Sequence, residues 1–303
     1  MGLKHLEYLR LDADQIKKRV RFLLAYARLC LEDFQAMSRF DDRRTGSDQT
    51  AWNARADAAS SLAEAAQLTT FYDARLAVEL FDAAGRHFVE LGHPYGLYLR
   101  AVANRWNPQE HFDLFATGIR NIEALYGSHP IDANREPIPR PWHAPQQQLY
   151  FLLAAAGSPV VRREFGSRLG EFARSSPNRR GVAPIGALGT AMYRLWDIAT
   201  HLLIEPESPT AAIVVTDHLA AMSRTYVEHV GLAMVNEYMW FHAASPVNVG
   251  DIDILGIAAL ASRTLSTPMF VSQMNSKMEQ LPPLSRVPAE LGIEIATQVK
   301  QSD

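Results

Sequence analysis

Apolar residues recur at intervals of three and four along most of this 303-residue chain, and this spacing constrains its fold more than any other feature. Such a spacing gives an α-helix one apolar face. The pattern is clearest over residues 14–40, where Val20, Leu24, Leu31 and Phe34 fall on one face. Because neither Gly nor Pro interrupts this stretch, it predicts one continuous helix with these four side chains buried.

The same periodicity predicts helices along the rest of the chain, with Gly and Pro near their ends. Gly92 and Pro94 end one helix, and Asn107 with Pro108 begin another. The prolines of residues 281–288 predict a linker before a short terminal helix. No alternation of apolar and polar residues is long enough to build a sheet, so the predicted fold class is all-α, as stacked helical hairpins or an irregular multi-helix bundle. Later helices are expected at residues 146–156, 159–174, 185–204, 209–242, 251–265 and 268–280.

A proline-rich segment divides the predicted helices into two groups. Residues 129–145 contain five prolines, which fix φ and lack the N–H groups that a helix or a central strand needs. We therefore expect a connecting surface loop at residues 129–145, with N-terminal helical hairpins in residues 1–128. A C-terminal helical region in residues 146–303 is expected to pack on the first.

Composition and charge exclude several classes of protein. Hydrophobic residues make up 48% and charged residues 21% of the chain, which indicates a packed core rather than disorder. The formal net charge of −3 disfavours a nucleic-acid partner outside a local patch. One cysteine, Cys30, leaves no internal disulfide or cysteine-based zinc site and fits the cytoplasm. The apolar stretch 183–204 contains charged residues, so no membrane partner is expected. No metal and no cofactor are expected either.

Residues 51–127 contain small and large apolar residues in the order found in paired, closely packed helices. The positions concerned are Ala65, Leu68, Ala77, Phe81 and Ala84. Their spacing resembles the small and aromatic pattern of tetratricopeptide-type helical hairpin repeats. The resemblance implies stacked hairpins that bind a protein or a peptide.

A polar seam follows one face of the long helix expected after residue 208. His218, Met222, His229 and Asn236 share this face at spacings that keep returning to the same side. His218 and His229 lie eleven residues apart, or about 16 Å along the axis, so they cannot bind one metal ion together. They either line a small-molecule pocket or are buried histidines satisfied by neighbouring helices.

A second polar feature is the pair Asp197 and His201, four residues apart on one expected helix. At this spacing the carboxylate can orient and charge the imidazole, as a general base requires. No neighbouring nucleophile or second carboxylate at metal spacing accompanies the pair in the sequence, so whether the chain is an enzyme stays open.

The most basic segment of the chain offers an alternative binding site. It is opposed only by Glu164 and Glu171, and guanidinium groups bind phosphates and carboxylates well. The segment therefore predicts either an anion or nucleic-acid site or a set of internal ion pairs. Its residues are Arg162, Arg163, Arg168, Arg174, Arg179 and Arg180.

These observations favour one function and leave two alternatives open. The favoured hypothesis is a helical interaction or scaffold protein that binds a protein or peptide partner in a groove. The alternatives are an all-helical enzyme or small-molecule receptor with a pocket near His218, and an anion or nucleic-acid binder that uses the arginine segment. Self-association through exposed aromatic residues such as Trp106 or Trp142 would make a homo-oligomer.

Overall fold

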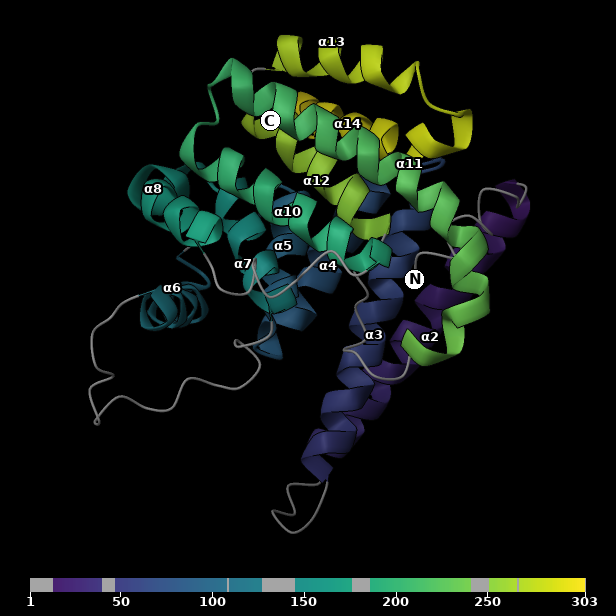
Figure 1. The fold of residues 1–303 in the computed structure, drawn as a ribbon. Coiled ribbons are helices and arrows are strands. Elements are labelled where there is room, and N and C mark those ends of the chain that lie inside the picture. Colours follow the sequence, from purple (N-terminus) through teal and green to yellow (C-terminus); the bar gives the residue numbers. More distant parts are fainter. Residues whose placement is uncertain are drawn as a thin grey trace.

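The computed structural model describes residues 13–39, 47–107, 109–126, 145–175, 186–240, 251–265 and 267–302. Within these ranges every regular element is an α-helix, which confirms the all-α fold class (Figure 1). The helices in chain order are α2 (Ala13–Arg39), α3 (Ser47–Thr69), α4 (Ala74–Glu90), α5 (Pro94–Val102), α6 (Phe112–Tyr126), α7 (Pro145–Gly157), α8 (Pro159–Ser175), α10 (Gly186–Ile204), α11 (Pro209–Trp240), α12 (Asp251–Thr264), α13 (Thr267–Met278) and α14 (Pro283–Ser302).

Helices that follow one another in the chain pack side by side in the N-terminal half. α2 lies on α3, α3 on α4, and α4 on α5. Helices from the C-terminal half complete the body, because α14 contacts α4 while α12 contacts both α5 and α7. One hydrophobic core therefore contains side chains from both halves. The α2–α3 hairpin extends beyond this body at the bottom of Figure 1.

The long helix predicted at residues 14–40 is confirmed as α2, but not all of its predicted core residues are buried. Val20 is buried, whereas Leu24, Leu31 and Phe34 are only half-buried. The reason is that α2 is an outer helix that packs along α3. The residues that face inward are those at the centre of its apolar stripe, namely Ile16, Val20, Leu23, Ala27 and Cys30.

Small residues bring the N-terminal helices close together. The five positions of the tetratricopeptide-like pattern, from Ala65 to Ala84, are all buried. α4 and α5 cross at Gly85 and Gly96, where a Cβ atom on Gly96 would lie 2.5 Å from the backbone nitrogen of Val89 and 2.6 Å from the carbonyl oxygen of Gly85. No side chain fits at this distance, so the crossing depends on glycine at both positions.

α5 is a nine-residue helix that the periodicity did not predict, and side-chain capping defines its start. Pro94 occupies its first turn, where a missing N–H costs nothing. The Nδ1 atom of His93 accepts a hydrogen bond from the backbone N–H of Tyr95 at 3.1 Å. Because His93 is enclosed by the fold, burial lowers the pKa of its imidazole to about 4.

The linker predicted at residues 281–288 is wrong, because α14 begins at Pro283 and includes Pro288. A proline there removes one helical hydrogen bond. Tertiary packing outweighs that loss, since Ala289, Ile295 and Ala296 are buried in the core. Gly292 permits the contact, as a Cβ atom at that position would lie 2.3 Å from the carbonyl oxygen of Leu255.

The packing of α2 predicts different costs for two adjacent leucines. Leu23 is 3% exposed in the core, whereas Leu24 is half-buried at the edge of the α2–α3 contact. Leu23→Ala should lower the free energy of unfolding by about 2 to 5 kcal/mol, and Leu24→Ala by clearly less. Urea denaturation of both variants measures the difference, and equal losses would contradict this placement of α2.

The His93 cap predicts that the fold is weakened by acid. The imidazole has a folded-state pKa of about 4 against 6.5 for an unperturbed histidine, so the unfolded chain binds the proton more readily. Stability from this group should be complete above about pH 6.5 and should fall by about 3 kcal/mol as the pH approaches about 4. His93→Asn keeps a capping oxygen without titrating, so denaturation curves across this range should show a smaller loss for that variant.

Candidate functional site

The predicted seam residue His218 lies between α10 and α11, where two charged side chains of α10 hold its ring. Its Nδ1 atom lies 3.1 Å from Nη1 of Arg194, and its Nε2 atom lies 3.3 Å from Oδ2 of Asp197. Because a guanidinium group can only donate, the Nδ1 atom accepts this hydrogen bond and the proton of a neutral ring sits on Nε2. The Nε2–H group then donates to Asp197.

This arrangement determines what His218 can do chemically. Both ring nitrogens are engaged, so the neutral imidazole has no nitrogen left to accept a proton from a substrate. The carboxylate of Asp197, predicted to orient His201, contacts His218, and its charge also acts on His201. Burial lowers the pKa of His201, and the charge of Asp197 opposes this shift. His218, Arg194 and Asp197 thus form a polar contact that holds α10 and α11 together.

The other predicted pocket residues are only partly described. Met222 lies one turn beyond His218 on α11, and its side chain is buried in the hydrophobic core. His229 and Asn236 lie on the same helix, but their side chains fall outside the part of the chain that the structure describes. The structure therefore places His218 beside Arg194 and Asp197, while Met222 lies in the core.

The described members of the arginine segment lie on α8 and have different environments. Arg162 points inward, where its guanidinium donates to the carbonyl oxygen of Ala156 at the end of α7 and lies 3.4 Å from Oγ1 of Thr264. Arg168 forms an ion pair with Glu123, whereas Arg163 and Arg174 are exposed. Arg179 and Arg180 lie outside the described residues.

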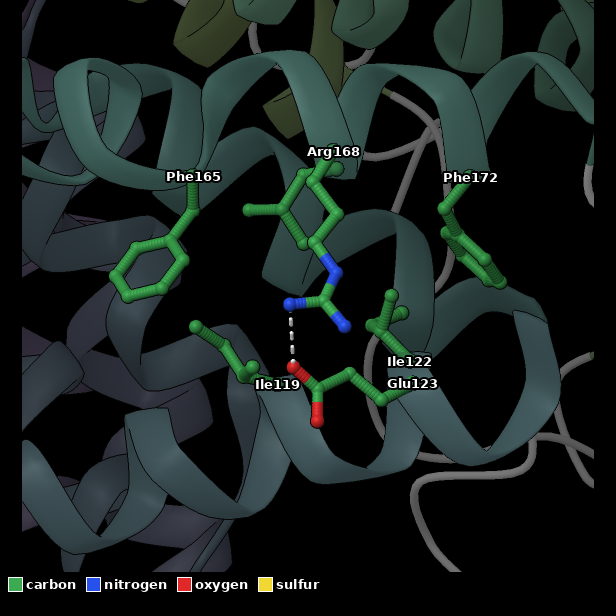
Figure 2. Close-up of a pocket in the computed structure, with 7 residues that line it drawn as sticks. Ile119, Ile122, Glu123, Phe165, Arg168 and Phe172 are labelled. Carbon is green, nitrogen blue, oxygen red and sulfur yellow. Dashed lines mark ion pairs between the residues drawn. The ribbon is translucent and has the colours of Figure 1, made fainter. Parts of the chain in front are cut away.

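A shallow groove runs between α6 and α8, and it contains one of the predicted arginines. It is a surface depression that encloses only about 10 Å³, roughly the room for one water molecule. Figure 2 shows Arg168 reaching from α8 toward Glu123 on α6, with Phe165 and Phe172 on either side. We call this feature the α6–α8 groove, and its lining residues are Ile119, Ile122, Glu123, Phe165, Arg168, Leu169 and Phe172.

The groove has a fixed apolar floor and a half-exposed wall. Ile122, Leu169 and Phe172 are buried, whereas Ile119 and Phe165 are half-buried. The sequence interpretation missed this groove because it treated the two helices separately. The sequence signal that could have revealed the groove is the spacing of three and four between apolar residues on α6 and on α8.

Aromatic packing and one buried arginine hold α6 in place beside α8. Phe115 on α6 packs against Phe151 of α7, with ring centroids 5.5 Å apart, and against Phe165 of α8 at 5.9 Å. Arg100 anchors the segment just before α6. Its guanidinium lies 2.9 Å from Oδ1 of Asp82 and 3.0 Å from Oε2 of Glu110.

Charged residues of both signs stand at the rim of the α6–α8 groove. Oε1 of Glu123 lies 3.0 Å from Nη1 of Arg168. The spacings of four and three on α8 also place Glu164 and Glu171 beside Arg168, and both are exposed. The lining itself carries one carboxylate, Glu123, and one guanidinium, Arg168. Arg120, exposed and three residues before Glu123 on α6, adds a second cation beside the groove. Three carboxylates and two guanidinium groups therefore flank the groove, which is a small excess of negative charge.

The aromatic residue proposed for self-association is less exposed than predicted. Trp106 is half-buried, and its ring packs against His111 and Phe115 at centroid distances of 5.9 and 6.3 Å. This packing corrects the expectation that Trp106 is an exposed aromatic surface. Trp142 lies outside the described residues.

Comparison of the chain with protein-family models, curated proteins and solved structures finds no match. No helix among the described residues combines the length and the apolar character that a membrane crossing requires. Nowhere in the described ranges do three or more His, Cys, Asp or Glu side chains gather as a metal ion would need. The functional argument therefore depends on the geometry of this chain alone.

Two arginines that contact carboxylates should differ strongly in their effect on stability. Arg168 is 60% exposed, so Arg168→Met should change the free energy of unfolding by less than about 1 kcal/mol. Arg100 is buried, so Arg100→Met leaves Asp82 with less of its countercharge and should cost about 3 kcal/mol. Thermal or urea denaturation tests both values. A large loss for Arg168→Met would show that the groove pair is structural.

Proposed function

We propose that this protein is a helical interaction protein whose α6–α8 groove binds an amphipathic, basic peptide segment of a partner protein. The proposal keeps the interaction function that the sequence favoured and assigns it a surface. A groove between two helices suits the apolar face of a partner segment, since apolar side chains bury area while polar ones stay at the rim. The stacked hairpins at the N-terminus, of tetratricopeptide type by resemblance, would act as the rigid support.

The observation that carries this proposal is the exposure of Phe112. Its side chain is 60% exposed, although the residue is large and apolar. Phe112 lies two helical turns before Ile119 on α6, so both residues share one face, and Ile119 lines the groove. The apolar surface of the groove thus continues along α6. Exposed aromatic residues that extend an apolar cleft are typical binding anchors.

The charge of the rim supports a basic partner. Glu123, Glu164 and Glu171 slightly outnumber Arg168 and Arg120 beside the groove, so a lysine or arginine of the partner would gain more than an aspartate or glutamate. The pairing of Arg168 with Glu123 weighs against the anion-binding alternative at this place, because a carboxylate already compensates that arginine. The enzyme alternative loses support from the engagement of both nitrogens of His218.

Selection from a random-peptide display library tests this function. Peptides enriched on the wild-type chain should combine apolar residues at helical spacing with lysine or arginine. A selected peptide, labelled with fluorescein, should bind Phe112→Ala about tenfold more weakly in an anisotropy titration, as loss of an anchor predicts. Phe22→Ala is the matched control, since Phe22 is 57% exposed but lies on α2.

Three outcomes would overturn the proposal. One is that no peptide is enriched over a blank surface. The second is that the enriched peptides are acidic. The third is that Phe112→Ala and Phe22→Ala weaken binding equally, which would mean that exposed aromatic residues bind peptides wherever they lie.

A further inference from the structure

A second apolar surface lies on the outer face of α2, far from the groove. Three of the nine large apolar side chains that are exposed in the described part of the chain lie here: Phe22 at 57%, Tyr26 at 42% and Leu29 at 58%. Their spacings of four and three place them on one face, to one side of the stripe that packs on α3. We call this face the α2 outer stripe.

Contacts within the chain hold the aromatic rings of the α2 outer stripe in place. Phe22 and Tyr26 are nearly parallel, with an interplanar angle of 4° and centroids 6.3 Å apart. The guanidinium of Arg19 lies 5.3 Å from the centroid of the Phe22 ring, and it is itself bonded to Glu64 of α3 at 2.9 Å. Ordered apolar rings bind at a lower cost in entropy than mobile ones do.

The two ends of the α2 outer stripe carry opposite charges, so the stripe is complementary to a second, antiparallel copy of itself. Lys18 lies one turn before Phe22, and Asp33 lies one turn after Leu29, and both are exposed. A twofold axis that passes between Ala25 and Tyr26 would place Lys18 opposite Asp33 of a second copy, and Phe22 opposite its Leu29. Gln15 would lie opposite Ala36 in the same way, and both are exposed. An antiparallel second copy of α2 would therefore meet apolar groups with apolar groups and each lysine with an aspartate.

We propose that two copies of this chain associate through their α2 outer stripes as an antiparallel, twofold-symmetric dimer. Such an interface is isologous, so each contact occurs twice. Tyr26 of each copy packs over the small side chain of Ala25 of the other, and two Lys18–Asp33 ion pairs close the ends. A parallel pair would place lysine against lysine and aspartate against aspartate. One helix face makes a small interface, so the dimer dissociates in the micromolar range.

Sedimentation velocity over a micromolar concentration series measures this association. Lys18→Glu and Asp33→Lys should each weaken the dimer about tenfold or more, since each variant creates two like-charge contacts. The double variant, Lys18→Glu with Asp33→Lys, restores two opposite-charge pairs and should recover most of the wild-type affinity. Phe22→Ala should weaken the dimer, whereas the equally exposed Phe112→Ala on α6 should not.

Disulfide trapping tests the antiparallel orientation separately. Ala25→Cys places two thiols beside the twofold axis, so oxidation should link the copies rapidly. Ala36→Cys places its thiols about 30 Å apart along the antiparallel pair and should not link them. The native Cys30 is buried and provides the uncross-linked background in the wild-type chain.

The dimer proposal is overturned by any of three results. These are a monomer at every concentration, a dimer that is unaffected by Phe22→Ala, and a double charge variant that is no tighter than its single variants. Linking of Ala36→Cys as fast as Ala25→Cys would reject the antiparallel orientation. None of these results affects the groove on α6 and α8.

Discussion

The close approach of helices at small residues is the constraint on which the rest of this structure depends. α4 and α5 meet at Gly85 and Gly96, α8 meets the end of α10 at Gly166, and α14 meets α12 at Gly292. At the last two glycines a Cβ atom would lie 2.5 Å from the carbonyl oxygen of Leu203 and 2.3 Å from that of Leu255. Backbones this close leave little space for enclosed cavities, so the two proposed binding surfaces are outer helix faces.

Tight packing also encloses polar ends of helices, which must find partners inside the protein. Arg263 on α12 donates to the carbonyl oxygen of Ala101 at 3.1 Å and to that of Val102, at the end of α5. Arg162 does the same for Ala156 at the end of α7. A cation beside these unsatisfied carbonyls is favourable, because the end of a helix carries partial negative charge. Both arginines thus stabilise the fold through hydrogen bonds to backbone carbonyl groups.

The sequence predicted those features that depend on local periodicity, and missed those that depend on tertiary packing. The helix from Ala13 to Arg39 followed from an uninterrupted apolar stripe, and its ends agree within a residue. The sequence did not predict that α14 begins at Pro283 and continues through Pro288. Local rules place a proline such as Pro288 outside a helix, but the burial of Ala289 and Ile295 outweighs its cost. α5 was missed because all nine of its residues are buried and show no amphipathic face.

The candidate site was only partly predictable, for a similar reason. Sequence singled out Arg168 and His218, but their partners Glu123 and Asp197 lie on other helices, and spacing along one helix does not reveal contacts between helices. The exposure of Phe112 likewise became visible only when α6 was placed beside α8. The self-complementary charges of α2 could be read from the sequence. Their exposure could not, because it depends on which side of the helix α3 covers.

The free energy of unfolding of Gly96→Ala tests the packing account most directly. Helix propensity alone predicts that alanine at an interior helical glycine stabilises the protein by about 0.5 to 1 kcal/mol. The close crossing predicts the opposite sign, because the new Cβ atom would lie 2.5 Å from the nitrogen of Val89 and would force α4 and α5 apart. A destabilised variant agrees with helices locked together at small residues. A variant more stable than the wild type would contradict that account.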